Sequence, residues 1–313
     1  MFSRFLQSQH PSCLAEELRP AFLGMDAAHR PVAATLIADV MGHASPAQKE
    51  QLRDALEEAG IVELGHRGTR RLSPWRRALA CEMLGKIGAH RSVPVLLERL
   101  EDRRPEVRMA AVQALGDIGS AEAVPALGEA FLARRVAPTD VVNEALRRIG
   151  IDAFPVFERG VASADPVIRI SSCFGLAGIV EERRACAFRL ALVLDTDSDA
   201  RVRTAAASAL GILGGEEAPA PLRRAATDGD VHVRRSSVKA LGSFDDPTTG
   251  QTLDGCTEDE DRETAIRAAE ALLALARRPR AAPEARARLE SSSAWAVVYA
   301  LMVAVVSAWS SCF

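Results

Sequence analysis

Residues 105–119 read PEVRMAAVQALGDIG and predict a single amphipathic α-helix. The apolar side chains recur at the i, i+3, i+4 and i+7 positions that form one stripe along a helix. They are Val107, Ala110, Ala111, Ala114, Leu115 and Ile118. Gly119 then suits the left-handed conformation in which many helices end, and Pro125 suits the first turn of a second helix. The stretch therefore predicts a unit of two helices joined by a turn.

The same unit recurs along the chain. Its core leucine returns at spacings of 30 to 34 residues, at Leu84, Leu115, Leu146, Leu176, Leu210, Leu241 and Leu272. A period of this length is typical of a solenoid, in which each unit has an apolar face that only its neighbours can cover. We therefore predict an all-α fold, an α-solenoid of about seven helix pairs.

These units resemble the short bacterial HEAT repeats that are also found in bilin lyases, with the pattern V-R-x-x-A-x-x-A-L-G-x-I-G. The resemblance covers roughly Ser73 to Arg278. It departs from the pattern in the third copy, where Pro138 and Thr139 replace Val-Arg, and in the seventh copy, which lacks the two glycines. Because bilin lyases share these repeats, the resemblance leaves a bilin-lyase-like enzyme or cofactor-maturation factor as an alternative to a non-catalytic binding protein.

The chain on either side of the repeats is different in character. Residues 1–73 predict an N-terminal helical cap, and Ser45 with Gln48 forms a capping box that starts a helix ending near Ala59. An alternative for residues 61–72 is a β-hairpin, which together with the helices would resemble a winged helix. The remaining boundaries are predicted as repeats at 74–278, an arginine-rich linker at 279–293 and a hydrophobic helix at 294–313.

The hydrophobic segment at 294–313 has the length of a membrane-spanning helix, about 30 Å for some twenty residues. Trp295 and Trp309 stand near its ends, as interfacial aromatic residues do, and arginines precede it. Its small residues form a stripe that lets membrane helices approach closely, at Ala296, Ala300, Ala304 and Ala308. We expect a tail anchor that holds the protein at the cytoplasmic face of a membrane. The alternative is a buried C-terminal cap helix of a cytoplasmic protein.

Composition and motifs argue against several classes of function. The net charge of -3 gives no overall attraction for nucleic acid. The six histidines and six cysteines are scattered without zinc-type spacing, and no nucleotide-binding or hydrolase motif is present. We therefore expect no catalytic, cofactor or metal site, no nucleic-acid partner and no small-molecule substrate. We expect most of the cysteines to be small buried core residues.

The predicted function is a scaffold that binds an unidentified protein partner, with regulation of a membrane enzyme as one form of that role. The second helices of these repeats resemble those that line the concave side of HEAT solenoids. Charged residues just after their core leucine or phenylalanine are therefore expected to face the partner. These candidates are Glu98, Glu129, Glu158, Arg159, Arg189, Arg223 and Arg224.

The arginine of each Val-Arg pair and the aspartates that precede it are interpreted as structural. The aspartates are Asp102, Asp165, Asp197, Asp199, Asp228 and Asp230. An aspartate that ends one helix pair and an arginine that opens the next can hydrogen-bond between adjacent turns, and a charged aspartate also suits a helix N-terminus. We therefore predict a ladder of such contacts.

Overall fold

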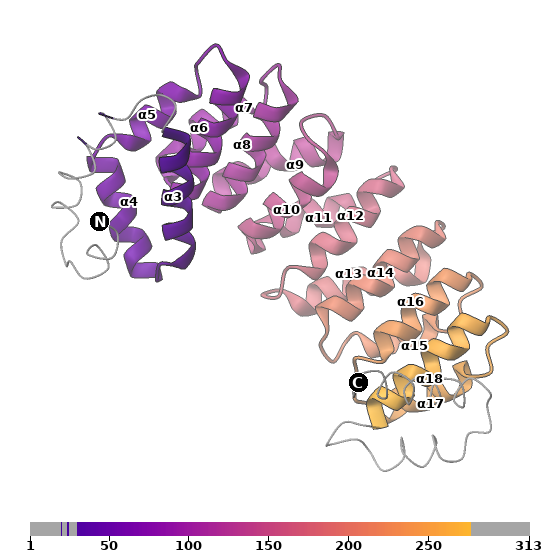
Figure 1. Ribbon diagram of the computed structural model, residues 1–313. Helices are drawn as coiled ribbons and strands as arrows, with labels where there is room; N and C mark the ends of the chain where they lie inside the picture. Colours follow the sequence, from indigo (N-terminus) through magenta and orange to yellow (C-terminus); the bar gives the residue numbers. More distant parts are fainter. Residues whose placement is uncertain (1–19, 21–23, 25–29, 277–313) are drawn as a thin grey trace, which may run out of the picture. The chain divides into compact units, whose positions relative to one another are not determined.

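The computed structural model describes residues 20, 24 and 30–276, which contain helices and no strand (Figure 1). The chain divides into two compact units, unit 1 (Met1–Val156) and unit 2 (Phe157–Phe313). The first half of the described chain contains α3 (Arg30–His43), α4 (Pro46–Glu58), α5 (Ile61–Gly68), α6 (Pro74–Ile87), η1 (His90–Ser92), α7 (Val93–Arg99), α8 (Pro105–Ile118), η2 (Ala121–Ala123), α9 (Val124–Ala133), α10 (Thr139–Ile149), η3 (Ile151–Ala153) and α11 (Phe154–Gly160). The second half contains α12 (Pro166–Ala177), α13 (Arg183–Thr196), α14 (Ala200–Leu213), α15 (Pro219–Ala225), α16 (Val231–Leu241), α17 (Pro247–Cys256) and α18 (Arg262–Ala276).

Each repeat consists of a first helix that carries the core leucine and a second helix that follows it. The first helices are α6, α8 and α10 in unit 1, and α12, α14, α16 and α18 in unit 2. All seven core leucines, from Leu84 to Leu272, are 0% exposed. The predicted all-α solenoid and its repeat register are therefore confirmed. A second helix after α18 would fall outside the described residues.

The helices before the repeats confirm one prediction and correct another. Ser45 accepts a hydrogen bond from the Gln48 amide, and the Gln48 side chain accepts one from the Ser45 amide, so the predicted capping box starts α4. The β-hairpin alternative for residues 61–72 is wrong, because α5 occupies Ile61–Gly68. Its buried residues include Ile61 and Gly65, four positions apart, which is a helical rather than an alternating spacing.

Neighbouring first helices approach each other closely through glycine and alanine. A Cβ atom on Gly85 of α6 would lie 2.5 Å from the Ala114 Cα on α8, and one on Gly116 would lie 2.6 Å from the Ala145 Cα on α10. In unit 2 a Cβ on Gly211 of α14 would lie 2.8 Å from the Ala240 Cβ on α16. The glycine of the repeated Ala-Leu-Gly therefore allows two helix backbones to touch. Figure 1 shows α6, α8 and α10 side by side as a result.

The predicted ladder of arginines and aspartates is present in both units. We define the arginine ladder as Arg77, Arg108, Arg169, Arg203 and Arg234. Four of these arginines form paired hydrogen bonds, 2.7 to 3.1 Å long, with an aspartate in the following inter-repeat turn. The pairs are Arg77 with Asp102, Arg169 with Asp197, Arg203 with Asp228, and Arg234 with Asp259. Within each unit the ladder therefore joins each first helix that carries it to the turn before the next one.

One ladder arginine bonds to a carbonyl instead of a carboxylate, and three of the predicted aspartates lie outside the ladder. Arg108 donates to the Val136 carbonyl at 2.7 Å, because the turn it reaches has valine where the others have aspartate. The other predicted aspartates do not join the ladder but begin first helices: Asp165, Asp199 and Asp230 each accept hydrogen bonds from amides of the helix that follows. Both roles proposed for the aspartates are thus observed.

Within residues 30–276, no helix is both long and apolar enough to span a membrane. The predicted membrane helix lies outside the described residues, and so do Trp295, Ala296, Ala300, Ala304, Ala308 and Trp309.

The close helix contacts predict the effect of adding a single methyl group. Gly85→Ala and Gly116→Ala should each lower the free energy of unfolding by about 1–3 kcal/mol, because the new Cβ would meet backbone atoms that cannot move aside. Urea unfolding followed by circular dichroism measures this change. Gly255→Ala is the matched control, since nothing lies within 4 Å of its Cβ position. Equal stability of all three variants would contradict the close approach.

The ladder predicts a loss of stability in acid. Hydrogen bonds from Arg77 and Arg203 hold the pKa values of Asp102 and Asp228 below their ordinary range. A lowered pKa in the folded state means that the stabilisation is complete above the pKa of the unfolded chain and is lost as the pH falls through the folded pKa, that is, below about 4. Asp102→Asn with Asp228→Asn should therefore cost about 1–3 kcal/mol per site at neutral pH. The difference from the parent should shrink in acid.

Urea unfolding at a series of pH values tests this prediction. Glu122→Gln with Glu181→Gln is the control, because both side chains are exposed and outside the ladder. A stability difference between parent and ladder variant that stays constant down to about pH 2 would contradict it.

Candidate functional site

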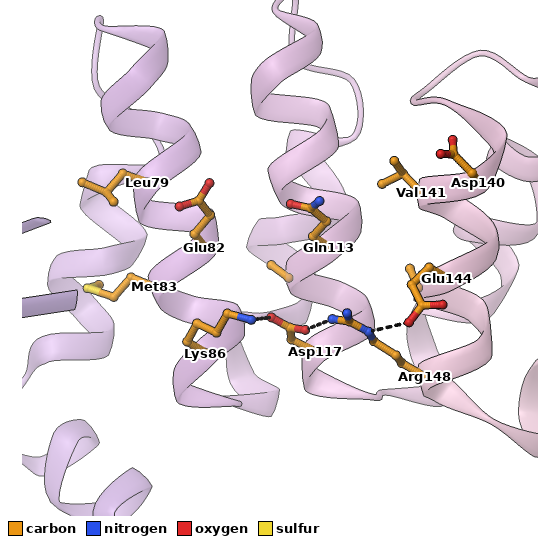
Figure 2. Close-up of a pocket in the computed structure, with 12 residues that line it drawn as sticks. Leu79, Glu82, Met83, Lys86, Gln113, Asp117, Asp140, Val141, Glu144 and Arg148 are labelled. Atoms are coloured by element: carbon orange, nitrogen blue, oxygen red, sulfur yellow. Dashed lines mark hydrogen bonds and ion pairs between the residues drawn. The ribbon is translucent and has the colours of Figure 1, made fainter. Parts of the chain in front are cut away.

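The first helices of unit 1 form an open groove with a volume of about 550 Å³ (Figure 2). Three neighbouring helices contribute its walls and floor. The lining residues are Leu79, Glu82, Met83 and Lys86 of α6, Gln113, Ala114 and Asp117 of α8, and Asp140, Val141, Glu144, Ala145 and Arg148 of α10.

The spacing of these residues explains why they share one surface. On each helix they recur at intervals of three and four positions, singly or as adjacent pairs, so they project from the same side. Ala114 and Ala145 lie at the floor, where they also pack against Gly85 and Gly116. The same small residues that let the helices approach therefore leave space above them. Leu79, Met83 and Val141 add larger apolar surface to the groove.

A chain of ion pairs closes one end of the groove. Lys86 Nζ lies 2.7 Å from Asp117 Oδ2, Asp117 also pairs with Arg148, and Arg148 Nε lies 3.1 Å from Glu144 Oε1. Figure 2 shows this chain running across all three helices. Burial lowers the pKa of Arg148, but its hydrogen bond to Glu144 and the charge of Asp117 together raise that pKa above its ordinary value. These four charged groups neutralise one another.

The other end of the groove has uncompensated negative charge. Glu82 and Asp140 are exposed and form no ion pair with any described side chain. In Figure 2 they lie on opposite sides of the groove, with Gln113 between them. Asp140 is also in the first turn of α10, where a carboxylate is favoured by the helix dipole. Glu82 lies in the middle of α6 and has no such structural reason.

The groove continues toward the start of α6. Leu79 and Glu82 also line an adjoining hollow formed with Trp75, Pro74, Ala78 and Glu106. Trp75 is 55% exposed, which is unusual for so large an aromatic side chain. The combined surface therefore offers an aromatic ring, an apolar floor and acidic rims.

The residues predicted to bind a partner lie elsewhere, on second helices. Glu98 is exposed on α7 and pairs with Arg99 at 3.2 Å, and Glu129 is exposed on α9. Neither lines the groove. In this unit the structure therefore places the predicted acidic residues on second helices and the groove on first helices.

In unit 2 the structure brings one pair of the predicted residues together. Glu158 of α11 pairs with Arg189 of α13, and Arg159 is exposed beside Glu158. The other two arginines pair with aspartates, Arg223 with Asp246 at 2.7 Å and Arg224 with Asp195 at 2.6 Å. A role for these residues in partner binding stays a prediction.

The described thiols are buried and have little nucleophilic character. Cys81, Cys173, Cys186 and Cys256 are all buried and unpaired to one another, as predicted for core residues. Burial raises the pKa of the Cys81 and Cys173 thiols to about 12, and that of Cys186 and Cys256 to about 11. Within residues 30–276, no group of three or more His, Cys, Asp or Glu side chains is arranged to hold a metal ion.

Comparison with known sequences defines the family. The family model for HEAT repeats matches residues 68–147 and 155–241. Because these stretches make up more than half of the chain, the protein belongs to the HEAT-repeat family. No curated protein matches the chain in sequence.

Solved structures with similar folds include natural and engineered proteins. Kap95p, in a structure with RanGDP, is 11% identical with a TM-score of 0.51, and the match covers 83% of this chain and 42% of Kap95p. The phycocyanin lyase complex of CpcE and CpcF from Nostoc sp. PCC7120 is 20% identical with a TM-score of 0.36, covering 94% of this chain and 95% of that one. An engineered protein is 19% identical with a TM-score of 0.41, covering 92% and 82%. At these identities the likeness concerns the fold alone.

The groove residues were not among the candidates predicted from the sequence. A usable signal was present, because Glu82, Gln113 and Glu144 occupy the same repeat position, two residues before the core leucine. Because the buried stripe occupies one face of each first helix, the residue two positions before the core leucine lies on the face that is not covered by the core. Aligning the exposed positions as well as the buried ones would have found this surface.

Proposed function

We propose that this protein is a scaffold that binds a partner protein in the groove formed by α6, α8 and α10. HEAT-repeat proteins present extended surfaces of stacked helices to which other proteins bind. The observation that supports this groove is the pair of uncompensated carboxylates, Glu82 and Asp140, on either side of an apolar floor. The helix dipole accounts for Asp140, but no contact within the described fold accounts for Glu82 in the middle of α6.

The chemistry of the groove indicates the kind of partner. Leu79, Met83 and Val141 offer contacts for an apolar side chain, and methionine adapts to the shape of the group it meets. A lysine or arginine next to that side chain would reach Glu82 or Asp140. Opposite charges across an interface speed association and discriminate against acidic partners. The partner segment is therefore apolar and basic.

The arrangement of the remaining charges favours binding over catalysis. Lys86, Asp117, Glu144 and Arg148 are held by one another, so none of them is available as an isolated acid or base. The groove is open along its length, and an open groove does not exclude water as enclosed active sites do. Its shape and charge suit a peptide segment better than a reacting small molecule.

Charge reversal tests the groove. Peptides selected from a displayed random library against the full chain should be enriched in sequences that combine lysine or arginine with a large apolar residue. Glu82→Lys with Asp140→Lys should weaken the binding of a selected peptide at least about tenfold, since close charge pairs across interfaces contribute on the order of 1.5 kcal/mol or more. Isothermal titration calorimetry measures the change.

The matched control is Glu122→Lys with Glu181→Lys, which changes the net charge equally at exposed positions outside the groove. This variant should bind the selected peptide as the parent does. Equal weakening by both variants would mean that only overall charge matters. Unchanged binding by the groove variant would exclude the groove as the site.

We further propose that residues 294–313 tether this scaffold to the cytoplasmic face of a membrane, where it would bring its partner to a membrane enzyme. The support is the sequence: an uncharged stretch of spanning length, bounded by Trp295 and Trp309 and preceded by arginines.

Extraction of membranes with alkaline carbonate tests the tether. The full-length chain should stay in the membrane pellet, because a spanning helix is not released when charge-based contacts are broken. A chain truncated after Glu290 should be released. Release of both proteins to the same extent would exclude a spanning helix and favour the buried cap.

A further inference from the structure

A second surface of unit 1 lies at the turns that connect its repeats. Each of three successive turns contains two adjacent arginines, and we call the set the arginine edge. It consists of Arg70 and Arg71 before α6, Arg103 and Arg104 before α8, and Arg134 and Arg135 before α10. All six side chains are exposed. The pairs recur at intervals of one repeat, so they form a row along one side of the unit.

The arginine ladder fixes the three turns next to one another. Arg77 donates to the Arg71 and Leu72 carbonyls at 3.0 Å and also to Asp102 in the next turn. Arg108 donates to the Asp102 carbonyl at 3.0 Å and to the Val136 carbonyl in the third turn at 2.7 Å. Each turn is therefore bonded to the one beside it. First helices in contact are about 8–10 Å apart, which sets the spacing of the arginine pairs.

Most of the charges of this surface are exposed and are not paired within the described fold. Arg70, Arg71, Arg103, Arg104 and Arg135 form no ion pair with any described carboxylate. Arg134 has a left-handed backbone with φ 53°, a conformation that costs a non-glycine residue about 1 kcal/mol or more. The exposed acidic neighbours of the arginine edge in these turns and helix starts are three, Glu101, Glu106 and Asp140, against six arginines. The row is therefore strongly positive.

The corresponding turns of unit 2 prove that the fold does not require these arginines. Those turns, at 161–165, 197–199, 226–230 and 257–261, contain no arginine or lysine. They nevertheless carry the same ladder bonds, from Arg169, Arg203 and Arg234. The repeat therefore forms without the residues of the arginine edge, which are particular to the turns of unit 1.

Two large apolar side chains are exposed at the same edge. Leu72, directly after Arg71, is 99% exposed, and Trp75, at the start of α6, is 55% exposed. The Arg76 guanidinium lies over the Trp75 ring, 5.4 Å from its centroid. An exposed leucine and tryptophan surrounded by arginines is the combination found where proteins meet a lipid headgroup layer.

We propose that the arginine edge docks on an anionic lipid surface, with Leu72 and Trp75 entering the headgroup region. Anionic lipids attract basic residues held near the surface, and tryptophan favours the boundary between headgroups and acyl chains. The three turns present their charges in one row, which a flat surface can meet at the same time. The edge would orient unit 1 against the membrane.

The apolar pair favours a lipid surface over nucleic acid. Phosphates of a nucleic-acid backbone would pair with the arginines, but an aliphatic side chain at the tip of a turn gains nothing from a phosphate row. In a lipid headgroup layer the same leucine buries apolar area. The inference depends neither on the groove between α6, α8 and α10 nor on residues 294–313.

Vesicle binding by the full-length chain tests the proposal. Flotation with vesicles of phosphatidylcholine alone and with added phosphatidylserine separates the charge-dependent part of binding from any contribution of residues 294–313, which is common to both. The triple variant Arg71→Gln, Arg104→Gln and Arg135→Gln should weaken the part of the binding that depends on phosphatidylserine on the order of 100-fold. Each arginine near an anionic surface contributes about fivefold, and the three factors multiply. Raising the salt concentration should weaken the parent in the same direction.

The matched control is Arg91→Gln with Arg147→Gln and Arg184→Gln. It removes the same charge from exposed arginines outside the inter-repeat turns and should retain the parent's binding. Circular dichroism checks that both triple variants keep their helical content. If the two triple variants lose binding equally, or if neither does, the arginine edge is not the docking surface.

The fluorescence of Trp75 separates lipid from nucleic acid. Trp295→Phe with Trp309→Phe leaves Trp75 as the single tryptophan of the three in the chain. With phosphatidylserine vesicles, its emission should shift to shorter wavelength and be quenched by brominated acyl chains. Binding to a DNA duplex that depends on the arginine edge, without lipid-dependent quenching of Trp75, would overturn the proposal in favour of a nucleic-acid surface.

Discussion

The contact between neighbouring first helices is the constraint on which the rest of the structure depends. At Gly85 against Ala114, and at Gly116 against Ala145, a Cβ atom on the glycine would not fit against the facing helix. The helices are therefore held at a fixed distance and register, and the leucine before each glycine is carried into the core. The open side of each first helix is fixed at the same time. Groove and core are two consequences of one packing contact.

Arginine has two different roles in this protein, and burial separates them. Arg77 and Arg234 are largely buried, and each satisfies its fork of donors with an aspartate and with backbone carbonyls. A buried guanidinium without such partners would be strongly destabilising, so these residues are bound by the fold. Arg71 and Arg104 stand a few residues away with exposed side chains that form no ion pair with a carboxylate in the described part of the chain. The buried arginines hold the turns in place by hydrogen bonds. The exposed arginines leave their charges accessible to solvent at the surface of the turns.

The fold was predictable because its signals are local and repeated. The stripe around Leu115, Gly119 as a left-handed cap and the capping box at Ser45 each depend on residues within one or two helical turns. The hairpin alternative at 61–72 was wrong. A β-strand would bury every second residue, whereas the buried residues Ile61 and Gly65 are four positions apart and share a helical face.

The groove was not predicted, because it depends on contacts between repeats. The sequence shows that Ala114 and Ala145 belong to the core pattern, but not that they also form the floor of a hollow between three helices. That requires knowing how closely α6, α8 and α10 approach. The candidates on second helices, such as Glu98 and Arg224, were inferred from the family resemblance, which specifies the repeat but not the surface that one member uses.

The net charge of the chain does not describe its individual surfaces, for a related reason. A value of -3 for the whole chain sums turns rich in arginine in unit 1 and turns rich in aspartate in unit 2. Exposed charges are screened over about 8–10 Å at physiological ionic strength, which is close to the spacing of adjacent helices in a repeat array. A partner at one turn therefore responds to that turn and its immediate neighbours, while the rest of the chain contributes little. In a protein built by adding repeats, the relevant charge is that of a few successive repeats. For unit 1 this local charge is positive at the turns and negative in the groove, so the two proposed surfaces offer opposite charges to a partner.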